Sequence, residues 1–244
     1  MALELVSVRC LSDNYAWLIH GPGGTALIDA PEADPVLAAL AERGWSLDHI
    51  ALTHHHHDHV QAAPRLVAAT GAQVIGAAAD AHRLPPLDLA VRPGDSVALA
   101  GHPAQVIDVS GHTIGHIAFY LPQDGLAMTG DSLMAMGCGR LFEGDADTMW
   151  ASLSRLNALP ADTLICSGHD YCATNAAFAL SVEADNQAIS QRLHSGQPCA
   201  PATLAQERQT NPFLRVAALR PALGMAGASD ASVFARLRQM KDDF

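Results

Sequence analysis

Thr53-His54-His55-His56-His57-Asp58-His59 contains five histidines and one carboxylate in its last six positions. The stretch directly follows residues 49–52, a short apolar run that predicts a buried strand. Affinity tags are also rich in histidine, but they lie at chain termini, whereas this run is internal. Neutral imidazole and carboxylate groups together suit zinc, iron and manganese. The stretch therefore predicts a metal site at the end of a strand.

The spacing within this run indicates how it binds metal. It contains the pattern His-x-His-x-Asp-His, formed by His54, His56, Asp58 and His59. Residues two apart in an extended segment point the same way, so His54 and His56 can bind one ion. Asp58 and His59, where the chain is expected to turn into a helix, can face another ion. A solvated loop commonly carries one histidine, but five beside an aspartate favour a metal site.

Length and composition set the broad class of the protein. With 244 residues, 49% of them hydrophobic and 16% charged, the chain can form one large domain, or one domain with a smaller partner. No run of about twenty apolar residues occurs, so no membrane span is predicted. The N-terminal residues show neither the basic region nor the apolar core of a secretory signal. The five cysteines form no Cys-x-x-Cys pair and are typical of a reduced intracellular set, so we expect a cytoplasmic protein without disulfides.

The charge balance narrows the choice of partners. A formal net charge of −11 produces a field that repels polyanions. Nucleic-acid-binding proteins usually carry a basic stripe, and this sequence has no stretch rich in Lys and Arg. A small anion can still bind through local positive groups and metal ions. We therefore expect a monomer with a small-molecule substrate and with no nucleic-acid or membrane partner.

Periodicity and turn signals predict an α+β fold. The expected strands are residues 3–8, 15–20, 25–29, 49–52, 73–76, 105–109, 117–121, 126–129 and 163–167. The expected helices are residues 35–43, 60–70, 147–159, 174–183, 186–193 and 232–241. Strand signals fade after residue 171, and residues 198–227, rich in proline and glycine, carry no clear signal. This pattern predicts two sheets with helices outside them, followed by a helical segment that begins near residue 170.

Three further candidate ligands lie where expected strands end, namely His112, Asp131 and His169. Loops after strands often carry functional residues, because the sheet holds them rigidly while the loop reaches solvent. Each of the three alone is more typical of a structural or solvated residue, but together with the run they complete a set of seven ligands. We expect two ions, each with three ligands, and one bridging carboxylate: His54, His56 and His112; Asp58, His59 and His169; and Asp131.

These residues resemble the metallo-β-lactamase superfamily, whose fold is an αββα sandwich. Further segments are similar to the hydroxyacylglutathione hydrolases, the glyoxalase II family: Thr-Gly-Asp-Ser-Leu (129–133), Gly-Cys-Gly-Arg (137–140), Phe-Glu-Gly (142–144), Ser-Gly-His-Asp-Tyr (167–171) and Asn-Pro-Phe-Leu-Arg (211–215). Gly-Cys-Gly-Arg and Asn-Pro-Phe-Leu-Arg are far more selective for this family than the superfamily motif is. The resemblance implies a metallo-β-lactamase-like catalytic domain over residues 1–170 and a small helical substrate-binding domain over residues 171–244.

The resemblance implies hydrolysis of a glutathione thioester, S-D-lactoylglutathione, to D-lactate and glutathione in methylglyoxal detoxification. It implies two divalent metal ions per chain, with zinc expected and iron or manganese as alternatives. Metal lowers the pKa of bound water to about 7, so a hydroxide held between two ions can attack the thioester carbonyl. The leaving thiol, with a pKa of about 8.5, departs without a strong general acid. The candidate catalytic residues are Asp131, as the bridge, and Asp58, which can orient the hydroxide.

By the same resemblance, four residues are candidates for substrate binding: Arg140, Phe142, Tyr171 and Arg215. Arg140 lies where the family often has lysine. The arginine keeps the positive charge but changes the hydrogen-bond geometry. Phe142 replaces a frequent tyrosine, so one hydroxyl contact is lost. Residues 216–219 are apolar where a basic residue is frequent in the family. Outside this motif context, both arginines would be interpreted as ordinary surface residues.

Several other reactive residues have simpler interpretations. His55 and His57 are either hydrogen-bonding partners of the ligands or packed residues, and we favour packed residues. His116 is expected to support the neighbouring loop through hydrogen bonds rather than to bind metal. Cys138 has no identifiable base beside it, so we interpret it as a small buried side chain. Nothing in the sequence alone places Asn14 near the site.

Other functions on related scaffolds are weaker alternatives. A persulfide dioxygenase with one iron would not need the helical segment ending in Asn-Pro-Phe-Leu-Arg, and oxygen uptake would reveal it. A lactonase or a β-lactamase tends to lack both selective motifs, and a chromogenic substrate would reveal either activity. A non-catalytic metal-binding protein is disfavoured because storage sites are usually closed. A nuclease is disfavoured by the net charge of −11.

Overall fold

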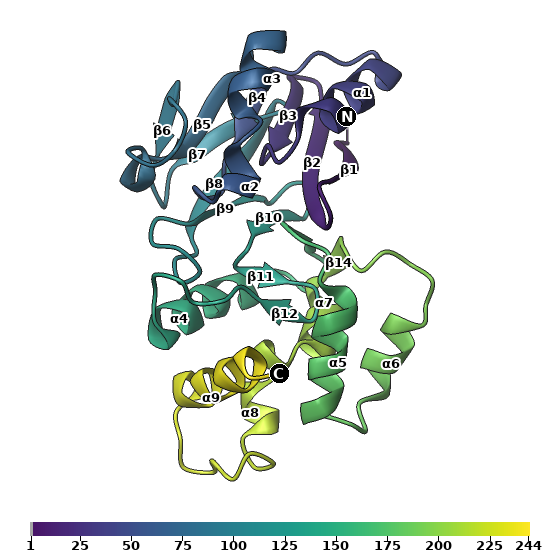
Figure 1. Ribbon diagram of the computed structural model, residues 1–244, viewed down its shortest axis with the longest axis vertical. Coiled ribbons are helices and arrows are strands. Elements are labelled where there is room, and N and C mark those ends of the chain that lie inside the picture. Colours follow the sequence, from purple (N-terminus) through teal and green to yellow (C-terminus); the bar gives the residue numbers. More distant parts are fainter. Residues whose placement is uncertain (1) are drawn as a thin grey trace. The chain divides into compact units, whose positions relative to one another are not determined.

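A computed structural model describes residues 2–244 (Figure 1). The chain forms two compact units. Unit 1 extends as far as Asp108 and includes Gly115–Gly130, and unit 2 consists of Val109–Ile114 and Asp131–Phe244. The boundary expected near residue 170 is therefore not the division between these units, and as a boundary between functions it stays a prediction.

Unit 1 contains a mixed sheet with the strand order β1-β2-β3-β4-β5-β6. The strands are β1 (Glu4–Cys10), β2 (Asn14–Gly21), β3 (Gly24–Ile28), β4 (His49–Ala51), β5 (Gln73–Ala77) and β6 (Leu89–Val91). The first three pair antiparallel through tight turns, and β3 to β6 pair parallel. The parallel strands place residues that follow β3, β4 and β5 at one common edge of the sheet.

Helices cover one face of this sheet and bury its apolar side chains. They are α1 (Ala33–Arg43), α2 (His57–Val60) and α3 (Ala63–Thr70). The core between α1, α3 and the sheet includes Leu18, Leu27, Ile50, Val36 and Leu66. Because β2 and β3 are buried along nearly their whole length, they read as continuous apolar runs rather than as alternating patterns.

The single helix expected over residues 60–70 is wrong in one respect, because the structure divides it into α2 and α3. The Ala62 N–H donates to the Ala30 carbonyl at 3.0 Å instead of continuing the helix. Pro64 has no N–H, so it fits only in the first turn of the helix that follows. The break lets α2 end directly after the histidine run.

Unit 1 also contains the antiparallel strands β7 (Ser96–Leu99), β8 (His102–Asp108), β9 (Ile117–Leu121) and β10 (Leu126–Gly130). Strands β9 and β10 are buried at every position. The expected hairpin of residues 117–121 and 126–129 is confirmed.

Unit 2 consists mainly of helices. Its elements are the hairpin β11 (Leu133–Met134) and β12 (Gly137–Cys138), α4 (Ala146–Asn157), β13 (Leu164–Ser167), α5 (Cys172–Val182), α6 (Gln187–Leu193), β14 (Ala202–Thr203), α7 (Leu204–Thr210), η2 (Pro212–Leu214), α8 (Val216–Leu219) and α9 (Asp230–Asp242). The helices expected at 147–159, 174–183, 186–193 and 232–241 are confirmed as α4, α5, α6 and α9.

The segment 198–227 is more ordered than its composition indicates, since it contains β14, α7, η2 and α8. Helix α7 begins with a capping box, in which Thr203 and Gln206 each pair with the other's backbone N–H. Asn211 caps η2 by accepting from the Phe213 N–H at 3.1 Å. Helices η2 and α8, of three and four residues, are too short to show a helical period in the sequence, and α7 lies in a segment rich in proline and glycine.

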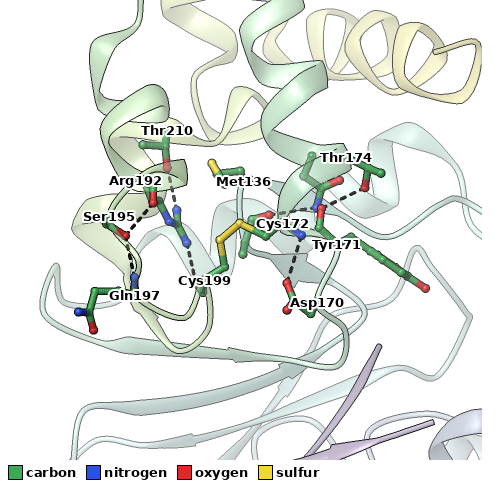
Figure 2. Close-up of a disulfide and its surroundings, with 12 residues drawn as sticks. Met136, Asp170, Tyr171, Cys172, Thr174, Arg192, Ser195, Gln197, Cys199 and Thr210 are labelled. Carbon is green, nitrogen blue, oxygen red and sulfur yellow. Dashed lines mark hydrogen bonds between the residues drawn. A yellow bond between two sulfur atoms is a disulfide. The ribbon is translucent and has the colours of Figure 1, made fainter. Parts of the chain in front are cut away.

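The expectation of a fully reduced cysteine set is wrong, because Cys172 and Cys199 form a disulfide (Figure 2). Their Cα atoms lie 6.0 Å apart, although 27 positions separate them in the sequence. Arg192 donates to the Cys199 carbonyl at 2.9 Å and so fixes the loop that carries this cysteine. No Cys-x-x-Cys motif could reveal the bond, because only the fold brings the two residues together. Cys10, Cys138 and Cys166 are buried and take no part in a disulfide.

Among the described residues, no helix combines the length and the apolar character needed to cross a membrane.

Candidate metal centre

In unit 1, the histidine run begins where β4 ends, and α2 starts at His57. The His54 ring lies 4.8 Å from the His56 ring and 4.2 Å from the His59 ring, between centroids. His54 and His59 are fully buried, whereas His57 is exposed. The expected turn from an extended segment into a helix is therefore confirmed, and it gathers three imidazoles of the run into one cluster.

Asp29, which follows β3, is a residue of this cluster that the sequence did not reveal. Its Oδ2 accepts from the His59 Nδ1 at 2.8 Å and from the Thr53 hydroxyl at 2.9 Å. Because the Thr53 hydroxyl donates to Asp29, it accepts from the His54 Nδ1, 3.0 Å away. One carboxylate thus fixes the tautomer of two histidines and leaves each Nε2 lone pair available for a metal.

Asp29, His54 and His59 place potential ligand atoms within 4.8 Å of one another. The Asp29 carboxylate, however, already accepts three hydrogen bonds, including one from the Thr53 backbone N–H at 2.8 Å. We therefore interpret Asp29 as the partner that orients the ligands, rather than as a ligand itself.

Asn14 contacts the other carboxylate of the run. Its Nδ2 donates to the Asp58 side chain at 3.0 Å and to the Asp58 carbonyl at 3.2 Å. Asn14 itself is buried, so this amide holds Asp58 at the first turn of α2. An isolated asparagine at the start of a strand carries no signal of this role, because the contact spans 44 residues.

In unit 2, His112, Asp131 and His169 come together. The Asp131 Oδ2 lies 3.5 Å from the His112 Nε2 and 3.3 Å from the His169 Nε2. These distances are long for hydrogen bonds. Two ligand atoms that each lie ~2.1 Å from a tetrahedral ion are ~3.4 Å apart, so both pairs have the spacing of ligands to a shared metal. All three residues are buried, with at most 5% exposure.

The backbone around residues 137–140 holds His112 in place. The His112 Nδ1 donates to the Arg140 carbonyl at 2.9 Å, which again leaves Nε2 available for a metal. A Cβ on Gly139 would lie 2.0 Å from the Asp131 carbonyl oxygen and 2.8 Å from the His112 Nδ1. The second glycine of the motif Gly-Cys-Gly-Arg is therefore required for a steric reason, because only glycine permits this close approach.

Exposed aromatic side chains lie beside both histidines of unit 2. The Phe142 ring packs edge-on against the His112 ring at 5.3 Å, and the Tyr171 ring stacks on the His169 ring at 4.7 Å. Phe142 is 62% exposed and Tyr171 is 40% exposed. Aromatic faces open to solvent beside candidate metal ligands can contact a substrate.

The candidate arginines differ in their contacts. Arg140 is exposed, and its Nε lies 3.2 Å from the Asp242 carboxylate at the end of α9. The Arg215 guanidinium makes a two-point ion pair with Glu183 and also donates to the Arg208 carbonyl at 3.3 Å. Arg215 is therefore engaged in holding α5 to the segment after α7.

Helix α9 carries two further cations, Arg238 and Lys241, close to the Asp242 carboxylate that Arg140 contacts. Arg238 donates to Asp242 at 3.0 Å and to the Cys138 carbonyl at 3.0 Å. Lys241 donates to the Thr174 carbonyl at 3.0 Å, in the first turn of α5. Burial and the neighbouring Arg238 charge lower the pKa of Lys241. Basic residues scattered along the last helix are an ordinary surface pattern, so they carried no signal.

Cys138 is buried and does not have the properties of a nucleophile. Burial raises the pKa of its thiol to about 11, despite the neighbouring charge of Arg238. The thiol therefore stays protonated at neutral pH, and the interpretation of Cys138 as a packed side chain is supported.

Sequence comparisons agree with this arrangement of ligands. Residues 12–169 match the metallo-beta-lactamase superfamily, and residues 170–244 match the hydroxyacylglutathione hydrolase C-terminus. A hydroxyacylglutathione hydrolase of Cereibacter sphaeroides is 58% identical over the whole of both chains, and so is one of Ruegeria pomeroyi.

The chain belongs to the hydroxyacylglutathione hydrolase family. Like other members of the metallo-beta-lactamase superfamily, this hydrolase has the expected α+β fold of two sheets and helices, with a helical C-terminal segment.

Solved structures also resemble this hydrolase. The crystal structure of ETHE1 from Myxococcus xanthus is 28% identical, with a TM-score of 0.69, and the match covers 98% of this chain and 90% of that chain. The protein TTHA1623, in a di-iron-bound form, is 29% identical, with a TM-score of 0.65, over 86% of this chain and 100% of that chain.

Proposed function

We propose that this chain hydrolyses the thioester bond of S-D-lactoylglutathione and related 2-hydroxyacylglutathiones, releasing D-lactate and glutathione. The observation that carries the proposal is the full-length similarity, at 58% identity, to proteins named hydroxyacylglutathione hydrolase. The match of residues 170–244 to the C-terminus of that family extends the argument beyond the shared superfamily motif. This reaction removes the thioester formed from methylglyoxal and glutathione.

We further propose that the chain binds two divalent metal ions, with zinc as the expected metal and iron or manganese as alternatives. The proposed sets are those expected from the sequence, with one bridging carboxylate: His54, His56 and His112; Asp58, His59 and His169; and Asp131. Two observations support the proposal. Asp131 faces two histidine Nε2 atoms at distances that suit shared ligands, and TTHA1623 has a di-iron-bound form.

The protein's own groups have distinct roles in the proposed reaction. Bound divalent metal makes hydroxide available at neutral pH and polarises the thioester carbonyl. Asp58 is proposed to accept a hydrogen bond from the attacking oxygen and so to direct it, and its contact with Asn14 supports this role because it restricts the carboxylate. The leaving group is a thiolate with a pKa of about 8.5, which departs without a general acid. This explains why the reaction needs no buried proton donor.

The substrate is proposed to bind along unit 2. Phe142 and Tyr171 offer exposed rings beside His112 and His169. Arg140 is proposed to bind a glutathione carboxylate, and the position of Lys241 makes it a further candidate. Arg215 remains a candidate only if its ion pair with Glu183 opens, so we propose that its main role is to hold α5.

The proposed division of labour follows the sequence expectation. Residues 1–170 are proposed to form the catalytic domain, which also carries Arg140 and Phe142, and residues 171–244 to form a helical substrate-binding domain. We propose that the protein acts as a monomer in the cytoplasm, on a small molecule rather than on nucleic acid. The net charge of −11 supports the preference for a small molecule over nucleic acid.

The test is turnover of S-D-lactoylglutathione, followed by the loss of thioester absorbance, with metal content determined on the same preparation. The wild type should hydrolyse the substrate with close to two metals per chain. Asp131→Ala should lose at least about a hundredfold in kcat/KM, because the carboxylate that faces both histidines is gone. Asp147→Asn, an exposed carboxylate on α4, is the matched control and should behave as wild type.

The main rival is a persulfide dioxygenase with a single iron. Oxygen uptake with glutathione persulfide, in the absence of thioester hydrolysis, would exclude the proposed reaction. The C-terminal family match argues against this rival, since it spans residues 170–244.

A further inference from the structure

Two buried carboxylates approach the histidine run in unit 1 from opposite sides. Strand β4 lies between β3 and β5 in the parallel part of the sheet, so residues after all three strands share one edge. Asp29 follows β3 and orients His54 and His59, as described above. Asp80 belongs to η1 (Ala78–Asp80), directly after β5, and it lies on the other side of β4. The proposed function gives Asp80 no role.

Asp80 is fully buried and held by several contacts. Its Oδ2 lies 2.9 Å from the His55 Nδ1, and its Oδ1 accepts from the Arg83 Nε. Its carbonyl accepts from the backbone N–H groups of Arg83 and Leu84. A Cβ on Gly115 would lie 3.1 Å from the Asp80 Cβ, so the backbone there packs closely against this side chain. Asp80 is therefore a rigid anchor.

The contact with Asp80 fixes the orientation of the His55 ring. Because a carboxylate only accepts, the His55 Nδ1 donates to it. The His55 ring packs edge-on against the His56 ring at 5.2 Å and 69°. The His56 ring in turn packs against the His54 ring at 4.8 Å and 74°. The fixed His55 ring thus limits the orientations that His56 can adopt.

We propose that Asp80 is a positioning residue for the metal centre, acting through His55 on His56. The sequence interpretation of His55 as a merely packed residue is replaced by a specific role, in which the ring is held by a buried carboxylate and restricts a ligand. The inference rests on the proposed function only in taking His56 as a metal ligand. Metal affinity, measured without substrate, therefore tests it.

The experiment is chelator competition on the purified, zinc-loaded chain, with the zinc retained per chain as the readout. Asp80→Ala should weaken zinc binding by about tenfold, the lower end of the loss seen when a group bonded directly to a ligand is removed, because Asp80 acts through His55. Asp124→Ala is the matched control, because Asp124 makes an equivalent contact with the His102 Nδ1 at 2.8 Å in the same unit. It should retain the wild-type zinc affinity.

A second control separates positioning from general stability. Arg83→Ala removes the other side-chain partner of Asp80 and leaves the His55 contact intact, so zinc affinity should not change. Two results would overturn the proposal. One is a zinc affinity in Asp80→Ala as high as that of Asp124→Ala, and the other is a loss of zinc affinity in Arg83→Ala as large as that in Asp80→Ala. Unfolding temperatures of all variants are measured alongside.

A double-mutant cycle tests the route through His55. His55→Ala alone should lose as much zinc affinity as Asp80→Ala, and the double variant should lose no more than either. Additive losses in the double variant would contradict the route through His55. If Asp80→Ala fails to fold, an unchanged affinity in His55→Ala overturns the proposal by itself. An absence of thioester hydrolysis in the wild type would bear on the proposed function, and the zinc measurement would stand.

Discussion

At the scale of single residues, the candidate centre depends on the hydrogen bond that the Nδ1 atom of each histidine makes. The Nδ1 atoms of His54, His59 and His112 are all engaged by Thr53, Asp29 or a backbone carbonyl. Their Nε2 atoms are thereby left to bind metal. The sequence supplied the candidate ligands, but two of the partners that orient them, Asp29 and the Arg140 carbonyl, lie about thirty residues away along the chain.

Gly139 is expected to be intolerant of any side chain. Gly139→Ala would place a methyl group 2.0 Å from the Asp131 carbonyl oxygen. Overpacking of this kind costs about 1–3 kcal/mol of stability, and the shift of Asp131 and His112 should lower thioesterase activity and zinc content together. Gly227→Ala is the control, since nothing lies within 4 Å of its added Cβ. Wild-type zinc content in Gly139→Ala would contradict this account.

The ion pair between Glu183 and Arg215 should make stability depend on pH. Burial alone would raise the pKa of Glu183, but hydrogen bonds from Arg215 and Asn186 outweigh it and hold that pKa below its usual 4.5. A carboxyl group with a lowered folded-state pKa stabilises the protein above the unfolded pKa, and the gain is lost as pH falls through the folded pKa.

Glu183→Gln should therefore be less stable than wild type at pH 7, by about 1 kcal/mol for a partly exposed pair. The difference should shrink as the pH falls below 4.5 and vanish once Glu183 is protonated in the folded state. Urea unfolding across this pH range gives the measurement. A difference that stays constant with pH would show that the ionised pair contributes nothing.

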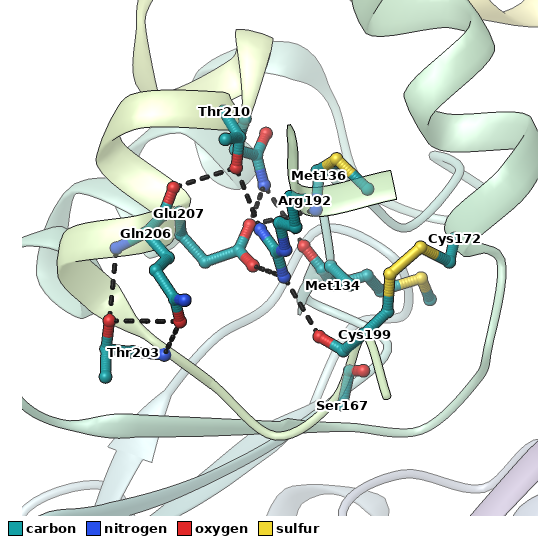
Figure 3. Close-up of polar contacts among 12 residues, drawn as sticks. Met134, Met136, Ser167, Cys172, Arg192, Cys199, Thr203, Gln206, Glu207 and Thr210 are labelled. Atoms are coloured by element: carbon teal, nitrogen blue, oxygen red, sulfur yellow. Dashed lines mark hydrogen bonds and ion pairs between the residues drawn. A yellow bond between two sulfur atoms is a disulfide. The ribbon is translucent and has the colours of Figure 1, made fainter. Parts of the chain in front are cut away.

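At the scale of elements, the motif Asn-Pro-Phe-Leu-Arg holds the hairpin β11-β12. The fully buried Asn211 donates to the Met134 and Gly137 carbonyls, at 3.1 and 2.9 Å. Glu207, also fully buried, accepts from the Met136 N–H and pairs with Arg192 (Figure 3). The hairpin leads directly to Gly139 and Arg140. The C-terminal motif thus holds a hairpin that leads to residues beside the candidate centre, and this is a structural reason for its selectivity.

The disulfide is an element-scale feature that can be tested directly. Titration of thiols in the denatured, unreduced chain should find Cys10, Cys138 and Cys166, and all five cysteines only after reduction. Cys172→Ser with Cys199→Ser should lower the free energy of unfolding by about 3 kcal/mol, because closing a loop of this length restricts the unfolded chain. Five reactive thiols without reductant would show that the bond is absent.

At the scale of the whole molecule, the proposed ligands range from residue 54 to residue 169, so metal binding should stabilise the native chain as a whole. A ligand that binds only the folded state adds about 4 kcal/mol at a thousandfold excess over its Kd. Removal of metal with a chelator should therefore lower the unfolding temperature and abolish activity, and added zinc should restore both. An unfolding temperature that does not change when the chelator is added would contradict a structural contribution of the metal.

The sequence by itself determined the metal-binding chemistry, the family and the longer elements. These features are local: the histidine run is contiguous, and α1, α4, α5 and α9 have enough residues to show a helical period. The selective motifs are short enough to be recognised one by one. Local periodicity could not reveal the short helices within residues 198–227, or the break between α2 and α3.

Only the tertiary structure decided which side chains support the candidate site. Asp29 and Asp80 have no local signal, because each becomes a partner of the histidine run through the pairing of β3 and β5 with β4. The Cys172–Cys199 bond and the commitment of Arg215 to Glu183 likewise join residues far apart in the chain. A sequence shows which groups are present, but hydrogen bonds depend on distances that the fold alone creates.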